Sequence, residues 1–163
     1  MKKLLFLTFA VGLIAMSFTV LDKKFPALKL KNLDGKEVDL NASFSKNKLT
    51  VVSYWATWCS PCKKELDAMN ELYSSWQKDG IEVIAITIDD IQQLNKVKPL
   101  AQQKKWKYTL LSDSNKESMR TLNFQSIPQT FVVDKNGNIL YTHSGYVAGD
   151  EFELEKKLKS FLK

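Results

Sequence analysis

The two cysteines of this chain lie in one short segment where a predicted strand meets a predicted helix. Residues 49–55, LTVVSYW, form a β-branched and aromatic run with the length of a buried strand. From Pro61 to Gly80, apolar residues recur at three- and four-residue spacing, which predicts one amphipathic helix. Cys59 therefore lies at or just before the N-terminus of this helix, and Cys62 lies in its first turn.

The rest of the pattern predicts an α/β fold with strands of mixed direction. Residues 28–40 alternate between apolar and polar around Asp34-Gly35, which indicates a β-hairpin. The other expected elements are a strand over 81–88, a helix near 91–105, a strand over 108–113, a short helix near 116–123, a hairpin of strands 130–134 and 139–145, and a closing helix over 152–162. We therefore expect a mixed central β-sheet flanked by helices.

The first segment has the composition of an export signal. Two lysines precede an apolar run that begins at Leu4, and Ala15 and Ser17 suit a signal-peptidase site. The uncharged run also has nearly the length of a membrane span. We expect residues 1–21 to be a signal peptide or an N-terminal membrane anchor. Residues 22–163 would then be one exported domain, in the periplasm or on the outer face of the cytoplasmic membrane.

Composition narrows the function classes. Apolar residues make up 44% and charged residues 26% of 163 residues, which are values typical of one globular domain. The formal charge of +6 comes from lysines scattered among acids, without an arginine-rich stripe, so we expect no nucleic-acid partner. No dinucleotide or phosphate loop occurs, and no cofactor is expected.

Three interpretations of the cysteine pair follow from its spacing. A structural staple that closes about four residues adds only roughly 2 kcal/mol, which a chain of this size hardly needs. A zinc site requires two more ligands, and the single histidine, His143, has no spacing partner; we expect it to be structural or solvent-facing, and we expect no metal. A redox couple is favoured, because a thiolate at a helix N-terminus faces unpaired N–H groups and the positive end of the helix dipole.

In the redox interpretation the two cysteines have different roles. Cys59 is the exposed attacking thiolate, and Cys62 is the resolving thiol that breaks the mixed disulfide. Pro61 fits the first helical turn without the loss of a hydrogen bond. Export favours this chemistry, because thiols meet an oxidising environment outside the cytoplasm.

Residues 55–65, WATWCSPCKKE, resemble the active-site segment of the thioredoxin superfamily, in particular of the exported TlpA/ResA-like thiol-disulfide oxidoreductases. Residues 25–40 are similar to the N-terminal hairpin of that branch, and residues 126–139, SIPQTFVVDKNGNI, are similar to its cis-proline segment and following hairpin. The resemblance covers essentially everything after the first segment. It implies a thioredoxin fold with an added N-terminal β-hairpin.

The resemblance also implies further site residues. Pro128 matches the family's cis-proline, which leaves the backbone of Ile127 free to pair with an extended substrate segment. Glu65 matches an acid that helps to move protons to or from the thiols, although spacing alone would make it a solvated helix residue. Trp58 matches an exposed active-site tryptophan, and its alternative is a partly buried aromatic at a strand end.

The activity that the resemblance implies is exchange of disulfides with another protein. We expect the pair to reduce protein disulfides and then to be re-reduced by a membrane electron-donor thiol protein, with cytochrome c maturation or stress-related reduction as the task. The two-cysteine spacing does not set the direction, so an oxidant or isomerase is the nearest alternative. A thiol peroxidase and a non-enzymatic peptide-binding adaptor are two less favoured functions for a chain of this fold.

Several positions depart from the family pattern. Ser53 stands where ordinary thioredoxins have a buried aspartate, so proton relay would fall to the glutamate or to water. Asp67 replaces a proline that kinks the helix in many relatives, and Gln129 replaces the threonine often found after the cis-proline. Asp89 and Asp90 follow a strand, and we expect them to cap the next helix rather than to bind a cation.

Overall fold

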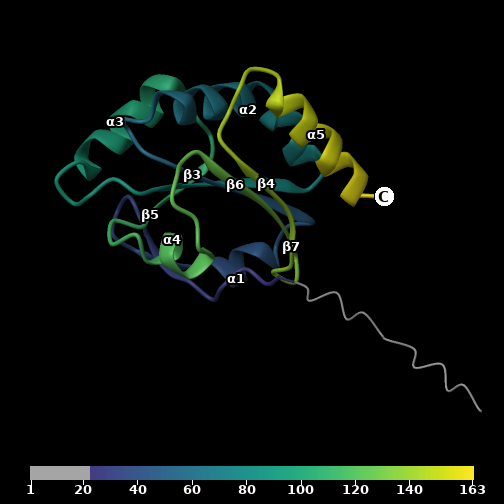
Figure 1. Cartoon of the computed structure of the whole chain (residues 1–163), viewed down its shortest axis with the longest axis horizontal. Helices are drawn as coiled ribbons and strands as arrows, with labels where there is room; N and C mark the ends of the chain where they lie inside the picture. Colours follow the sequence, from purple (N-terminus) through teal and green to yellow (C-terminus); the bar gives the residue numbers. More distant parts are fainter. Residues whose placement is uncertain (1–22) are drawn as a thin grey trace, which may run out of the picture.

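A computed structural model of the chain describes residues 23–163 (Figure 1). The expected signal peptide or anchor at residues 1–21 lies outside these described residues. Within residues 23–163, none of the helices combines the length and the apolar character needed to cross a membrane.

In the described part of the chain, seven strands form one mixed sheet in the order β2-β1-β5-β4-β3-β6-β7. Their bounds are β1 Lys29–Asn32, β2 Glu37–Asp39, β3 Leu49–Trp55, β4 Ile81–Thr87, β5 Thr109–Ser112, β6 Gln129–Asp134 and β7 Ile139–Ser144. Strands β3, β4 and β5 are parallel neighbours, whereas the two hairpins join the sheet as antiparallel strands. The predicted mixed sheet with an N-terminal hairpin is confirmed, and Gly35 takes the positive φ of 81° that its turn requires.

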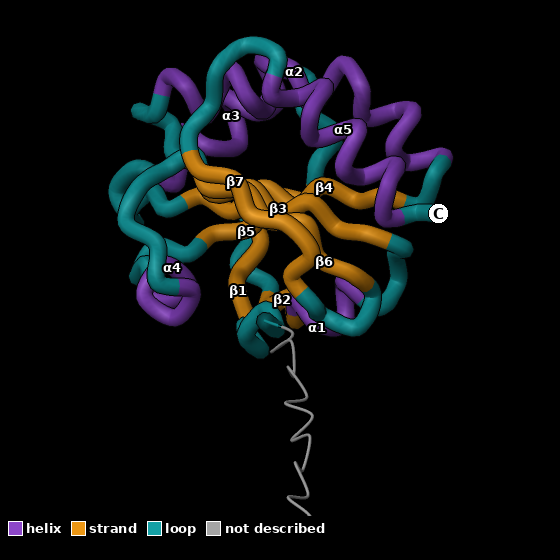
Figure 2. Tube along the Cα trace, turned by 45° about the vertical axis from the view of Figure 1, so that its right-hand side comes forward, coloured by secondary structure: helices purple, strands orange, loops and turns teal. Residues whose placement is uncertain are grey.

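Within residues 23–163, five helices cover the two faces of this sheet. They are α1 Leu40–Phe44, α2 Ser60–Lys78, α3 Leu94–Lys104, α4 Glu117–Leu122 and α5 Asp150–Phe161. Helices α2, α3 and α5 lie on one face, and α1 and α4 lie on the other (Figures 1 and 2). The chain steps in one direction from β3 to β4 to β5, so right-handed crossovers place α2 and α3 on the same face; it then turns back to β6, and α4 lies opposite.

Two helix boundaries differ from the prediction. Helix α3 begins at Leu94 rather than near residue 91, because the intervening residues form a turn. Helix α5 begins at Asp150, directly after Gly149, whose φ is 107°. The five-residue helix α1 was not predicted, because one turn is too short to show a helical period.

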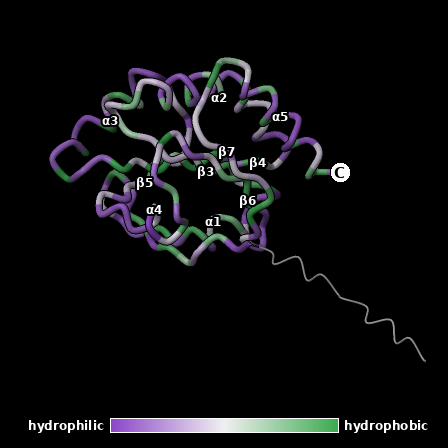
Figure 3. Tube along the Cα trace, viewed as in Figure 1, coloured by the Kyte–Doolittle hydropathy of each residue, from purple (hydrophilic) through white to green (hydrophobic). Residues whose placement is uncertain are grey.

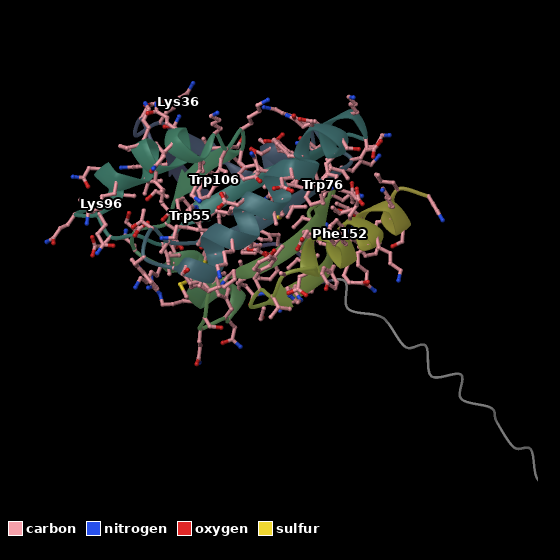
Figure 4. The ribbon with its side chains drawn as sticks, turned by 90° about the horizontal axis from the view of Figure 1, so that it is seen from above. Lys36, Trp55, Trp76, Lys96, Trp106 and Phe152 are labelled. Atoms are coloured by element: carbon pink, nitrogen blue, oxygen red, sulfur yellow. A yellow bond between two sulfur atoms is a disulfide. The ribbon has the colours of Figure 1, made fainter. Side chains whose placement is uncertain are left out.

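Helix α2 is fixed to the sheet by its buried face. Leu66, Met69, Tyr73 and Trp76 are at most 1% exposed, and Figure 3 shows hydrophobic residues along the central strands beneath the helices. The helix is continuous through Asp67, whose carboxylate accepts hydrogen bonds from Lys104 Nζ at 2.6 Å and Trp106 Nε1 at 2.9 Å. The ring of Trp106 in turn lies edge-on to that of Trp55, with centroids 5.1 Å apart (Figure 4).

The register of the sheet determines which loops meet. Parallel pairing matches Trp55 at the end of β3 with Thr87 at the end of β4. Antiparallel pairing matches Tyr54 with Gln129 at the start of β6. The segments that follow β3 and β4 therefore lie together with the segment that precedes β6, at one end of these strands.

We expect Leu66→Ala to lower the free energy of unfolding by about 2–5 kcal/mol, because it opens a cavity between α2 and the sheet. Leu140→Ala is the matched control, since Leu140 is 38% exposed on β7, and it should change stability by no more than about 0.5 kcal/mol. Urea unfolding of the oxidised proteins measures both values. Equal losses in the two variants would contradict this packing.

Candidate active site

Cys59 is the N-cap residue of α2, and it forms a disulfide with Cys62. The backbone N–H of Cys62 donates a hydrogen bond to Cys59 Sγ over 3.3 Å, and Pro61 lies in the first turn. Figure 4 shows the disulfide as a yellow bond at the edge of the molecule. The cysteine pair thus meets the unpaired N–H groups of a helix terminus, as expected from the sequence.

Cys59 is less exposed than predicted. Cys59 is 5% exposed and Cys62 is 0% exposed, and both belong to the hydrophobic core cluster. The prediction of an exposed Cys59 is therefore wrong for the disulfide form, although Cys59 is the more accessible of the two. The neighbouring Trp58 is 60% exposed, which leaves a large aromatic surface in solvent beside the disulfide.

A buried aspartate fixes the loop before Cys59. Asp89 is 0% exposed, and its carboxylate accepts hydrogen bonds from the N–H and the hydroxyl of Thr57, both over 2.9 Å. Lys63 Nζ donates to the carbonyl of the same threonine over 2.9 Å. The loop before Cys59 is thus fixed on one side by Asp89, which follows β4, and on the other by Lys63 of α2.

The prediction that Asp89 caps the next helix is wrong. Helix α3 begins later, and its N-cap Gln93 makes no side-chain capping bond. Only Asp90 behaves as a local cap, accepting from the N–H of Gln93 over 3.0 Å. Sequence reasoning missed the true role of Asp89. The signal that could have revealed it is the order of the strands: when β3 and β4 are parallel neighbours, the first acid after β4 lies beside the loop after β3.

Glu65 is a buried carboxyl group beneath α2. It is 4% exposed, and it accepts hydrogen bonds from Ser53 Oγ at 3.0 Å and Thr130 Oγ1 at 2.8 Å. These two hydroxyls are neighbours because Ser53 pairs with Thr130 in the β3–β6 register. The solvated alternative for Glu65 is therefore wrong, and the serine that replaces the usual aspartate serves as its partner.

Burial raises the pKa of Glu65 to about 7, although the hydrogen bonds from Thr130 and Ser53 favour its charged form. The charge of His143 also acts to lower this pKa, whereas that of Asp150 acts to raise it. A carboxyl group whose pKa lies near 7 both accepts and releases a proton near neutral pH.

The peptide bond between Ile127 and Pro128 is cis. It directly precedes β6 and therefore lies at the edge of the sheet where β3 leads to the cysteines. Within residues 23–163, the backbone N–H and C=O of Ile127 make no hydrogen bond. Gln129 is 3% exposed, and its side chain binds the β7 strand through the carbonyl of His143 and the hydroxyl of Ser144.

The single histidine lies on β7, the outermost strand next to β6. His143 on β7 is 34% exposed at its side chain, and its Nε2 lies 3.1 Å from Asp150 Oδ2. Across residues 23–163, no group of three or more histidine, cysteine, aspartate or glutamate side chains is placed to hold a metal ion.

We expect Glu65→Gln to remove a specific pH dependence of stability. The folded-state pKa of about 7 lies above the ordinary value of 4.5, so the native state binds more protons than the unfolded state between these values. The wild-type free energy of unfolding should therefore fall as pH rises through this window, by about 3 kcal/mol. Urea unfolding of both oxidised proteins across this range tests the prediction, and parallel pH curves would contradict it.

The AhpC/TSA family matches residues 21–142. The thiol-disulfide oxidoreductase ResA of Bacillus thuringiensis subsp. konkukian is 30% identical over 131 residues, which cover 80% of this chain and 73% of that protein. A thioredoxin-like protein of Porphyromonas gingivalis is 44% identical, with a TM-score of 0.74 over 85% of this chain and 91% of that one.

A third relative is a thiol:disulfide interchange protein of Chlorobium tepidum TLS. It is 26% identical, with a TM-score of 0.71 over 87% of this chain and 97% of that chain. These likenesses confirm the predicted thioredoxin-like fold, and the cysteine pair of the site is the chemistry that such enzymes use. The chain therefore belongs to the AhpC/TSA family, and it is a thiol-disulfide oxidoreductase with Cys59 and Cys62 as its active-site pair.

Proposed function

We propose that this enzyme is exported and reduces disulfides in protein substrates. The observation that carries the proposal is the position of Cys59 Sγ at the N-cap of α2, where it accepts the Cys62 N–H. After reduction, the same N–H groups and the helix dipole stabilise a thiolate there, which makes Cys59 an attacking group near neutral pH. The composition of residues 1–21 supports export.

The reaction then proceeds by two sulfur displacements. The Cys59 thiolate attacks one sulfur of the substrate disulfide, forms a mixed disulfide, and releases the other substrate sulfur as a thiolate. Cys62 gives its proton to the Glu65 carboxylate and attacks Cys59 Sγ. The second substrate sulfur leaves, the disulfide between Cys59 and Cys62 forms, and two electrons have passed from the enzyme to the substrate.

Glu65 is suited to take that proton. It follows Cys62 by three residues on the buried face of α2, and residues at this spacing are neighbours on a helix surface. Its pKa of about 7 is close to working pH, which is the condition for efficient proton transfer in either direction.

Substrate contact is assigned to the two sides of the disulfide. Trp58 offers an exposed ring, and the backbone of Ile127, which makes no hydrogen bond within the described residues, offers a donor and an acceptor. An extended substrate segment would pair with this backbone beside the cis bond to Pro128. A substrate protein would then be held by main-chain bonds, while the tryptophan covers the reacting sulfurs.

The oxidised pair needs an electron source to cycle. We assign this role to a thiol protein of the membrane, on the strength of the resemblance to the TlpA/ResA-like branch. The same resemblance makes cytochrome c maturation the proposed task. Because export exposes the pair to oxidants, a dedicated donor is needed to keep it reduced.

We expect Cys62→Ser to trap the mixed disulfide, because the resolving thiol is absent. Reduced C62S mixed with a disulfide-containing peptide should gain the mass of one peptide chain, and C59S should gain none. Turnover should be abolished in both variants. Intact mass spectrometry under non-reducing conditions measures the adduct, and an adduct on C59S instead of C62S would reverse the assigned roles.

A further inference from the structure

A small cavity with a mixed polar and apolar lining adjoins Glu65, and Met69 and Leu154 form part of its apolar wall. It has a volume of about 10 Å³, which is room for one water molecule. Its polar lining consists of Glu65, Thr130, Tyr141, His143, Tyr146, Asp150 and Glu151. The cavity thus joins the buried carboxyl group of α2 to side chains of β7 and α5.

A row of polar residues crosses three strands beneath this cavity. Ser53 on β3 pairs with Thr130 on β6, and Thr130 pairs with His143 on β7. Directly opposite residues project from the same face of a sheet. Exposure rises along the row, from 0% for Ser53 and 1% for Thr130 to 34% for the His143 side chain. The row therefore runs from the core, where Glu65 binds its first two members, to solvent.

His143 is held in a fixed orientation at the outer end of the row. Its Nε2 lies 3.1 Å from Asp150 Oδ2, and the same carboxylate oxygen accepts the N–H of Val147 over 2.8 Å. Its ring stacks on that of Tyr141, with planes 9° apart. When Nε2 carries the proton donated to Asp150, Nδ1 is free to accept another.

We propose that His143, oriented by Asp150, relays protons between Glu65 and solvent through one water molecule in this cavity. The inference rests on the proposed function, since Glu65 must discharge a proton only if the cysteine pair turns over. The proton leaves Cys62 Sγ for Glu65, passes through the water to His143, and then enters bulk solvent. No electron moves in these steps, and the path runs in reverse when the pair is re-reduced.

The other titratable groups around the cavity do not offer this route. Burial and the neighbouring Glu151 raise the pKa of Tyr146 to about 12, so its hydroxyl keeps its proton and donates it to Glu151 at 2.9 Å. Burial acts to raise the pKa of Glu151, but hydrogen bonds hold it below its usual range. Lys157 Nζ lies over the ring of Tyr141, 5.8 Å from the ring centroid. Histidine is the side chain in this set that ordinarily changes its charge near neutral pH.

A relay is needed because Glu65 itself has little access to water. It is 4% exposed, and both of its oxygens accept hydroxyl hydrogen bonds from residues that are at most 1% exposed. Loss of the relay should therefore slow the step in which Cys62 is deprotonated. The preceding attack by the Cys59 thiolate should not change.

The test separates these two steps in a single turnover. Pre-reduced full-length enzyme is mixed with an equimolar symmetric aromatic disulfide whose released thiol absorbs visible light. The first equivalent of thiol reports the attack by Cys59, and the second reports resolution by Cys62. In dilute buffer near pH 7, His143→Gln should slow the second phase by at least about tenfold and leave the first unchanged. Added imidazole should restore the second phase, because it replaces the missing proton carrier.

Two further variants complete the experiment. Thr142→Val is the matched control, since residue 142 is the exposed neighbour of His143 on the opposite side of β7, and both phases should match wild type. Asp150→Asn should slow the second phase partially and gain the same imidazole dependence, and it carries the test if H143Q does not fold.

A second phase in H143Q and D150N that equals wild type at every buffer concentration would overturn the relay. A slow second phase that imidazole does not restore would also overturn it, because that is the behaviour of a structural defect. Wild type would still release two equivalents in both cases, so the proposed function would stand. A wild-type protein that releases none would overturn the proposed function itself.

Discussion

The parallel ladder between β3 and β4 is the constraint on which the active site depends. It consists of seven pairs of buried or nearly buried residues, from Leu49↔Ile81 to Trp55↔Thr87, so both strands end at the same level. That shared end places Asp89 against the loop before Cys59 and directs the chain into the first turn of α2. The antiparallel β6 then begins at the same end of these strands, directly after the cis peptide bond. A helix N-terminus, a fixed loop and an unpaired backbone segment are assembled there by strand register.

The acid of the site is supplied by the helix rather than by the strand. Ser53 occupies the position where the related thioredoxin pattern has an aspartate, and Glu65 extends from α2 to bind its hydroxyl. The buried carboxyl group of this site is thus carried by α2. The placement on α2 brings Glu65 within reach of Thr130 and of the cavity that continues to β7. The burial that keeps its pKa near neutrality also creates the need for a path to solvent.

Features with a local period were predictable from the sequence. The buried strand at residues 49–55, the helix through Trp76 and the hairpin at Asp34-Gly35 each have a pattern of their own and were confirmed. Helix α1 is too short for a period. The burial of Glu65 and the role of Asp89 depend on which strands are neighbours, and spacing along the chain indicates the opposite for both. Likewise, Ser53, Thr130 and His143 form a row only because the register of three strands places them opposite one another, and no spacing along the chain indicates this.

The direction of electron flow is the central claim, and the reduction potential of the Cys59–Cys62 pair tests it most directly. The potential follows from how well the helix N-terminus stabilises the Cys59 thiolate relative to the disulfide. Equilibration of the full chain with dithiothreitol and glutathione buffers, read by alkylation and intact mass, gives this value. For a reductant that depends on a membrane donor, we predict a potential near that of thioredoxin, about −270 mV. A potential near that of DsbA, about −120 mV, would contradict the proposed direction and make the enzyme an oxidant.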